Sequence, residues 1–284
     1  MTGQYSFRVI GMVVAAMFMI VGGDAAATML TRAGFDQVFV AWSRFAVAAV
    51  LLAPFCGIRR EELPLFVDWR LALRAGLIVG GIVCILTALK TEPMANVFGG
   101  FFVGPVVSYF LSALLLKERI SVPRTLLLLV SFAGVMLVVR PGFGMSVGMG
   151  FAILAGCFHG SYLVATRWLA GGFRPRFLLL SQLAIGAVML APFAIGALPP
   201  LTGAAIGLVV ISALGSAAGN LLLVLVNRTT PAGVVAPLIY SQLLAAMVIG
   251  FAVFGQWPDA VSLIGLVIIM AAGASSVWFA GRGR

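Results

Sequence analysis

Two ionisable side chains, Asp24 and Arg44, lie within long apolar stretches of the sequence. A charge at the centre of a membrane helix costs roughly 2.5–3.5 kcal/mol, so each needs a physical reason. The two residues can form an ion pair that fixes one helix against the next. Alternatively, Asp24 can bind a proton or a cation, while Arg44 regulates it or anchors a substrate carboxylate. A third possibility is that Arg44 extends to the membrane interface without a partner.

A second polar group consists of His159, Tyr162 and Thr166, whose spacing of three and four residues places them on one face of a helix. His159 is the only histidine in the chain, and it can hydrogen-bond a substrate or accept a proton near neutral pH. The alternative is a buried histidine that bonds a neighbouring helix. We predict that His159 and Tyr162 bind substrate.

Ser212, Ser216 and Asn220 follow one another at four-residue steps along a third apolar run. Small hydroxyl residues at this spacing more often allow close helix packing than line a pore, so packing is favoured for the two serines. Asn220 is the better site candidate, because its amide has donors and acceptors that must be satisfied deep within a helix.

Five further side chains complete the predicted substrate site. They are Asn96, Phe102, Tyr240, Ser241 and Gln242. The aromatic members can stack on a planar solute or enclose a quaternary ammonium group. The alternative for each of them is a place in the protein core or against lipid.

The overall composition shows what kind of elements must position these residues. Of the 284 residues, 62% are hydrophobic and 9% are charged, and the mean hydropathy is +1.17. These values exclude a water-soluble domain and indicate an all-α integral membrane protein. Ten apolar runs have about the length, 17–25 residues, that a helix needs to cross the hydrocarbon core. They lie near residues 9–30, 38–58, 71–89, 94–116, 123–139, 147–169, 177–197, 202–226, 233–254 and 260–280.

The basic residues are distributed unequally between alternate connections. If the N-terminus is cytoplasmic, fourteen Lys and Arg residues, Arg74 among them, fall on the cytoplasmic side and three, Arg32, Lys90 and Arg140, on the other. The positive-inside rule then predicts that both termini are cytoplasmic, in a membrane of the bacterial inner-membrane type. The net charge of +10 is therefore a property of membrane topology, and nucleic acid is not expected as a partner.

An internal repeat runs through the chain. Residues 38–55 and 176–193 align without a gap at an offset of 138 and are identical at half of the eighteen positions. The offset places Gln182 on Arg44, so we predict that Gln182 shares a coupling or gating role with Arg44 and Asp24. A constant offset across several helices indicates two five-helix repeats, 1–140 and 141–284. Because five is odd, the second repeat must be inverted in the membrane, as in many transporters.

Two segments resemble a known family. AWSRFAVAAVLLAPF, at 41–55, is similar to the second helix of the EamA family of the drug/metabolite transporter superfamily. Residues 88–121 resemble its fourth-helix block, with a central Pro105 and a terminal Glu118-Arg119. The resemblance covers nearly the whole chain and implies ten helices in inverted repeats and the transport of amino acids, vitamins, cationic drugs or other metabolites.

We therefore predict a secondary active transporter of small organic metabolites, with amino-acid-like solutes favoured, that works by alternating access. The resemblance favours export. No nucleotide-binding loop is found in the sequence, so a solute gradient, exchange or a proton would drive transport. Cys56, Cys84 and Cys157 occur singly in apolar runs, so neither a disulfide framework nor a metal cluster is implied. No cofactor is expected.

Two other functions remain open. Proton-coupled transport of organic cations would require an unpaired Asp24 that faces the cavity. An intramembrane lipid-modifying enzyme would require clustered acids, histidines or a nucleophile with its base, so no enzyme activity is expected. The expected partners are a small-molecule substrate, the lipid bilayer and protons. Ten helices can enclose a complete site, so a monomer is expected.

Overall fold

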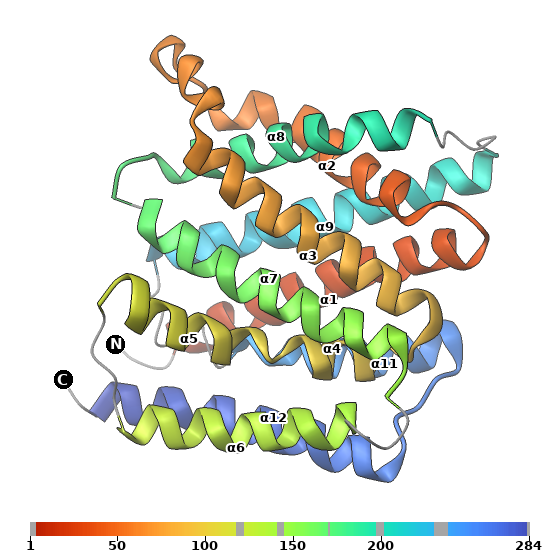
Figure 1. The fold of residues 1–284 in the computed structure, drawn as a ribbon, viewed down its shortest axis with the longest axis vertical. Helices are drawn as coiled ribbons and strands as arrows, with labels where there is room; N and C mark the ends of the chain where they lie inside the picture. Colours follow the sequence, from red (N-terminus) through yellow and green to blue (C-terminus); the bar gives the residue numbers. More distant parts are fainter. Residues whose placement is uncertain are drawn as a thin grey trace.

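The computed structural model of the protein describes residues 4–117, 122–140, 145–169, 171–196, 202–229 and 238–282. Within these ranges all regular structure is helical (Figure 1). Two short 3-10 helices, η1 (Arg60–Glu62) and η2 (Pro64–Val67), lie between α2 and α3. The α-helices are α1 (Gln4–Arg32), α2 (Gln37–Cys56), α3 (Trp69–Thr91), α4 (Met94–Phe101), α5 (Gly104–Leu115), α6 (Val122–Val139), α7 (Val147–Leu169), α8 (Pro175–Ile195), α9 (Gly203–Thr229), α11 (Ser241–Phe254) and α12 (Ala260–Arg282).

Capping residues in the sequence account for several helix ends. Asp36 accepts hydrogen bonds from the backbone N–H groups of Val38 and Phe39 and so begins α2, and Gly57, with a positive φ of 54°, caps the helix after Cys56. Asp68 caps α3 in the same way through the N–H of Arg70. The polar connections between apolar runs therefore determine where the helices begin.

Seven helical segments in the described part of the chain are long and apolar enough to cross a membrane. Three further apolar helices are shorter: Thr125–Val139, Ser241–Phe254 and Ala260–Ala272. The predicted run 233–254 is described from residue 238 onward. The all-helical membrane fold is thus confirmed, whereas the count of ten crossings stays a prediction.

The predicted run 94–116 is not one continuous helix. It consists of α4 and α5, with a break at Phe102 and Val103, and together they form one span, Met94–Leu115. Pro105 has no N–H to donate to the preceding turn, and it lies in the first turn of α5, where that loss is tolerated. The proline therefore interrupts the helix within the span.

The helix packing follows the internal repeat. Helix α1 packs against α9, and their counterparts at the 138-residue offset, α7 and α3, pack against each other. The pairs α2 with α8 and α6 with α12 each join a helix to its own counterpart, and α4 packs against α11, the counterpart of α5. Figure 1 shows α1 and α7 running in opposite directions across the molecule. The two halves therefore interlock around an approximate two-fold relation.

Glycines bring α9 close to α1. A Cβ atom added at Gly215 or Gly219 would lie 2.7 Å from the carbonyl oxygen of Met19 or Ala16, respectively. Such a distance is too short for a side chain, so only glycine allows this separation of the two backbones. The close contact places Asp24 of α1 beside the polar residues of α9.

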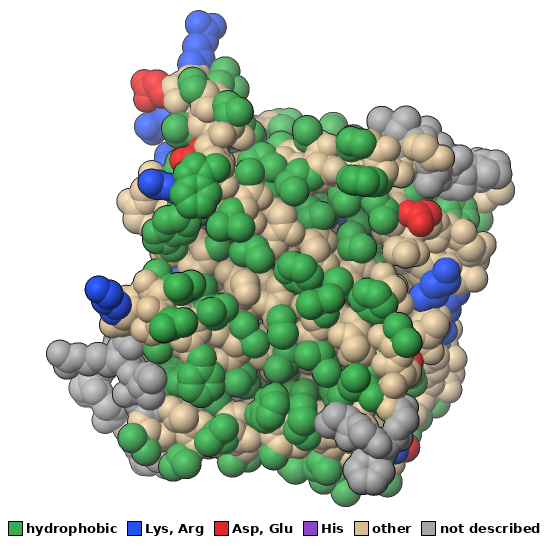
Figure 2. Space-filling model, viewed as in Figure 1, with side chains coloured by type: hydrophobic (Ala, Val, Ile, Leu, Met, Phe, Trp, Pro, Cys, Tyr) green, Lys and Arg blue, Asp and Glu red, His purple; other side chains and the backbone are tan. Residues whose placement is uncertain are grey.

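The surface of the molecule fits an apolar environment. In Figure 2, hydrophobic side chains are spread over the whole face shown, whereas Lys, Arg, Asp and Glu lie toward its margins. Large exposed side chains include Val50, Phe55, Leu114, Val188 and Phe193, all at least 70% exposed. An apolar face bordered by charge is typical of a protein surrounded by lipid.

Candidate functional site

A cavity of about 110 Å³ lies among five helices, α2, α3, α7, α8 and α9, from both halves of the chain. Its volume is sufficient for several water molecules. Its polar lining residues are Arg44, His159, Tyr162, Gln182, Ser216 and Asn220. Its apolar lining residues are Phe45, Ala48, Leu52, Ile78, Ile82, Leu179, Leu183 and Ala217.

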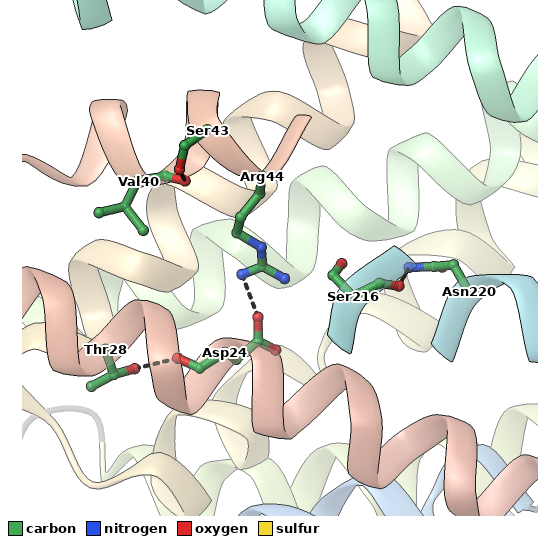
Figure 3. Close-up of polar contacts among 7 residues, drawn as sticks. All are labelled: Asp24, Thr28, Val40, Ser43, Arg44, Ser216 and Asn220. Carbon is green, nitrogen blue, oxygen red and sulfur yellow. Dashed lines mark hydrogen bonds and ion pairs between the residues drawn. The ribbon is translucent and has the colours of Figure 1, made fainter. Parts of the chain in front are cut away.

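The ion pair between Asp24 and Arg44 lies at this cavity. Arg44 Nη1 donates to Asp24 Oδ1 at 2.5 Å, and each residue is 5% exposed (Figure 3). Thr28 Oγ1 donates to the Asp24 carbonyl oxygen one turn further along α1. The guanidinium is therefore buried and paired and does not extend to the interface.

Most of the hydrogen-bonding capacity of Arg44 is unused. Among the described residues its single bond is the one to Asp24, and the buried Nε has no partner. Figure 3 shows the other amino end of the guanidinium pointing toward Ser216 and Asn220. Asn220 Nδ2 donates to the Ser216 carbonyl oxygen at 2.8 Å, which leaves its own side-chain oxygen as an acceptor. The site thus offers both donors and acceptors to a ligand.

A neutral counterpart of the ion pair lies in the second half. The 138-residue offset maps Asp24 onto Tyr162 and Arg44 onto Gln182. Tyr162 donates its hydroxyl hydrogen to Gln182 Oε1 at 2.6 Å. The repeat therefore preserves a hydrogen-bonded pair between successive helices but changes its chemistry from charged to neutral.

Arg74 is a polar residue that the sequence interpretation counted among the charges of a cytoplasmic connection. In the structure it lies within α3 and is 3% exposed. Its guanidinium donates to Thr166 Oγ1 and the Leu178 carbonyl oxygen at 2.8 Å each, and to the Tyr162 hydroxyl at 2.9 Å. Arg74 therefore joins α3 to α7 and α8 directly behind the cavity.

His159 lies in the cavity wall between aromatic rings. Its ring centroid is 4.9 Å from that of Phe101 and 5.8 Å from that of Tyr162. No hydrogen bond to its imidazole is found within the described residues. Both ring nitrogens are thus available to a ligand or to water.

The sequence also identifies the family of the protein. The family model described as "EamA-like transporter family" matches the chain twice, over residues 7–140 and 146–277. The chain belongs to this family.

Comparison with solved structures supports the fold of this EamA-like transporter. A solved structure described as "Crystal structure of protein" is similar at a TM-score of 0.66 and 18% identity, and the alignment covers 99% of both chains. At this identity the similarity shows the fold alone. No curated protein matches the sequence.

Of the residues predicted to act in this EamA-like transporter, Arg44, His159, Tyr162, Gln182 and Asn220 line the cavity, and Asp24 is bonded to one of them. The structure therefore brings these six candidates together.

The remaining five candidates lie away from the lining of this cavity. The rings of Phe102 and Tyr240 are 5.0 Å apart, where α4 meets α11. Ser241 Oγ donates to a backbone carbonyl oxygen in the preceding turn, and the Asn96 side-chain oxygen is buried without a partner. A role in substrate binding stays a prediction for these four residues and for Gln242.

Polar contacts at the predicted cytoplasmic end join the two halves of the EamA-like transporter. Arg174, before α8, donates through Nε and Nη2 to the two carboxylate oxygens of Glu62, at 2.7 and 2.6 Å. Hydrogen bonds from Arg174 and from the Arg59 backbone lower the pKa of Glu62 to about 2. Glu62 therefore stays ionised and paired near neutral pH.

The predicted outer end has its own contacts between the halves. Ser146 Oγ donates to Glu92 Oε1 at 2.5 Å, and Arg140 forms an ion pair with Asp259. Residues suited to a metal do not cluster here or elsewhere, since no group of three His, Cys, Asp or Glu is found among the described residues.

Proposed function

We propose that this protein is a secondary active transporter of a small, amino-acid-like metabolite and that it works by alternating access. The observation that carries the proposal is the cavity between the two interlocked halves, in which Arg44 is buried and bonded through a single donor. A guanidinium with free donors is suited to a carboxylate, which it can bind through two parallel hydrogen bonds. The solute carboxylate binds at Arg44.

Alternating access follows from the relation between the halves. Two similar, oppositely oriented units can give inward-open and outward-open states of similar energy, so modest ligand contacts shift the balance between them. The Glu62–Arg174 contact closes the predicted cytoplasmic end, and the Glu92–Ser146 and Arg140–Asp259 contacts close the predicted outer end. Each end opens when its own contacts between the halves separate.

The ion pair also offers a means of coupling to protons. When a solute carboxylate binds the free donors of Arg44 beside Asp24, a second negative charge shares the same guanidinium, so the protonated form of the buried Asp24 is favoured. By linkage, protonation of Asp24 then favours solute binding to the same degree. Asp24 is the coupling group in this proposal, and His159 is a second group able to accept a proton.

The direction of transport and the topology form part of the same proposal. Export is favoured by the family, and the solute gradient drives it. Both termini are cytoplasmic in a membrane of the bacterial inner-membrane type, as the unequal distribution of basic residues predicts. A monomer is sufficient because the cavity is enclosed by helices of one chain.

Transport of organic cations is the second candidate, and the geometry of Asp24 counts against it. A cation site needs an unpaired carboxylate, whereas Asp24 is bonded to Arg44 at 2.5 Å. Catalysis on lipid is disfavoured because, among the described residues that line the cavity, no carboxylate, cysteine or lysine accompanies His159.

Counterflow in reconstituted vesicles tests the proposal. Vesicles preloaded with unlabelled amino-acid-like solutes should accumulate the same solute in labelled form from outside, and Arg44→Gln should abolish this exchange. Arg70→Gln is the matched control, because it removes an exposed arginine of α3 whose guanidinium lies over the rings of Trp69 and Trp168. Exchange of organic cations alone, or exchange that survives Arg44→Gln, would contradict the proposal.

A further inference from the structure

The cavity lies between two polar clusters that correspond in position but differ in charge. The Arg74 cluster consists of Arg74, Tyr162, Thr166 and Gln182, which are joined by hydrogen bonds. The 138-residue offset pairs these residues, in that order, with Ser212, Asp24, Thr28 and Arg44. Each cluster holds one arginine, but the acidic residue occurs in only one of them.

All partners of Arg74 among the described residues are neutral groups. It donates to a threonine hydroxyl, a tyrosine hydroxyl and a backbone carbonyl, and its Cζ lies 4.9 Å from the centroid of the Tyr162 ring. These partners satisfy the guanidinium N–H groups without cancelling the charge. In a buried site of low polarity, the positive potential of such a group extends to neighbouring residues.

No carboxylate compensates Arg74 in the described part of the chain. The ion pairs found there use Asp24, Glu62 and Asp259, each with a different arginine. Asp68, the acidic residue nearest to Arg74 in sequence, caps the start of α3. Because Asp24 neutralises Arg44, the charges at the cavity sum to one positive charge, which comes from Arg74.

The Arg74 cluster also orients a donor toward the cavity. Arg74 donates to the Tyr162 hydroxyl, which in turn donates to Gln182 Oε1. The amide oxygen of Gln182 is thus occupied, and its NH₂ group remains available in the cavity wall. Arg44 supplies free donors from the corresponding position of the other half. Arg44 and Gln182 thus both place donors in the wall of one cavity, and two such donors can bind the two oxygens of one carboxylate.

The rest of the cavity offers little to an ammonium group. Most of its remaining wall is apolar, including Phe45, Ile78, Ile82 and Leu183, and Asp24 is already paired. A zwitterion would therefore bring a positive charge into a site that already has an excess positive charge. Removing that ammonium group from the solute removes the repulsion.

We propose that the solute is a monocarboxylate with an apolar body and no free ammonium group, such as the N-acylated or 2-oxo form of an amino acid. Its carboxylate binds between Arg44 and Gln182, and Arg74 is a positioning residue that acts through Tyr162 and supplies the selecting charge. The inference rests on the proposed transport function and narrows its substrate class.

A matched series of solutes tests this selectivity in vesicles that contain the full-length protein. Leucine, its 2-oxo acid, N-acetylleucine and leucinamide share one side chain and carry net charges of about 0, −1, −1 and +1 near pH 7. The alanine and phenylalanine series extend the test to other side-chain sizes. We expect the two anions to inhibit counterflow at about tenfold lower concentration than the zwitterion.

Variants of Arg74 separate the effect of charge from that of structure. Arg74→Gln should reduce the preference for the anions by about tenfold, whereas Arg74→Lys, which keeps the charge, should retain it. Arg70→Gln removes a charge from the same helix outside the cavity and should leave the preference unchanged. Elution volume and thermal unfolding of each purified variant show whether it is folded.

The possible outcomes distinguish this inference from the proposed function. Equal or better transport of leucine would overturn the monocarboxylate inference while leaving an amino-acid-like transporter in place. Retention of the anion preference in a folded Arg74→Gln protein would remove Arg74 as the selecting charge. Transport of leucinamide alone, or of none of the series, would overturn both the monocarboxylate inference and the proposed transport of amino-acid-like solutes.

Discussion

Tyr162 occupies in the second half of the molecule the position that Asp24 occupies in the first, and each bonds the residue twenty positions further along the chain. One of these pairs is ionic and the other is neutral. The backbone arrangement is thus nearly symmetric, while the chemistry on the two sides of the cavity is not. The difference in charge between the two pairs gives the cavity its net charge and allows the two halves to respond differently to a ligand.

The effects of Asp24 and Arg44 on the free energy of unfolding should depend on each other, because the two residues form a buried ion pair. Asp24→Asn leaves Arg44 buried without a counter-ion, and Arg44→Gln leaves Asp24 in the same condition, so each should lower the free energy of unfolding by about 3–5 kcal/mol. The double variant resembles the neutral pair of the other half and should be less destabilised than the two single effects added together. Denaturant unfolding in detergent measures this coupling, and strictly additive effects would exclude it.

Proton coupling should depend on groups at the cavity. Asp24→Asn and His159→Ala should each abolish solute accumulation driven by a pH gradient, because each removes a group able to bind the coupled proton. Counterflow at equal pH on both sides serves as the control for folding and binding in each variant. If pH-driven accumulation persists in both variants, neither residue carries the proton.

The sequence predicted the membrane helices and the repeat because both depend on local properties, namely apolar length and a constant offset. It also predicted six residues that the cavity brings together. Arg74 was missed because its position near the start of a helix resembles that of a topological charge. The 138-residue offset pairs Arg74 with Ser212, a polar residue within an apolar run, and this pairing could have indicated that Arg74 lies inside a helix. The break at Phe102 and the separation of Asn96 and Tyr240 from the cavity depend on tertiary packing, which periodicity does not reveal.

The close contact between α1 and α9 should be sensitive to a single methyl group. Gly215→Ala would place a Cβ 2.7 Å from the Met19 carbonyl oxygen, so the helices must separate, at a cost of about 1–3 kcal/mol. Gly207→Ala is the matched control, because Gly207 lies on the same helix and a Cβ added there would meet no atom of another element within 4 Å. We expect a lower unfolding temperature for the first variant and an equal or higher one for the second. Equal effects of both changes would mean that helix propensity, not packing, is being measured.

The ion pair between Glu62 and Arg174 should make stability depend on pH in the acid range. The pKa of Glu62 is lowered from an ordinary value of 4.5 to about 2, so its stabilising contribution is fully present above about pH 4.5 and is lost as the pH falls toward 2. Glu62→Gln removes this contribution at every pH. The unfolding temperatures of the wild-type protein and this variant should therefore differ at pH 7 and converge toward pH 2.

Glu61→Gln changes an exposed neighbour without an ion pair among the described residues and should follow the wild type throughout. A constant difference between wild type and Glu62→Gln from pH 7 to pH 2 would show that the carboxylate does not stabilise the fold through this pair.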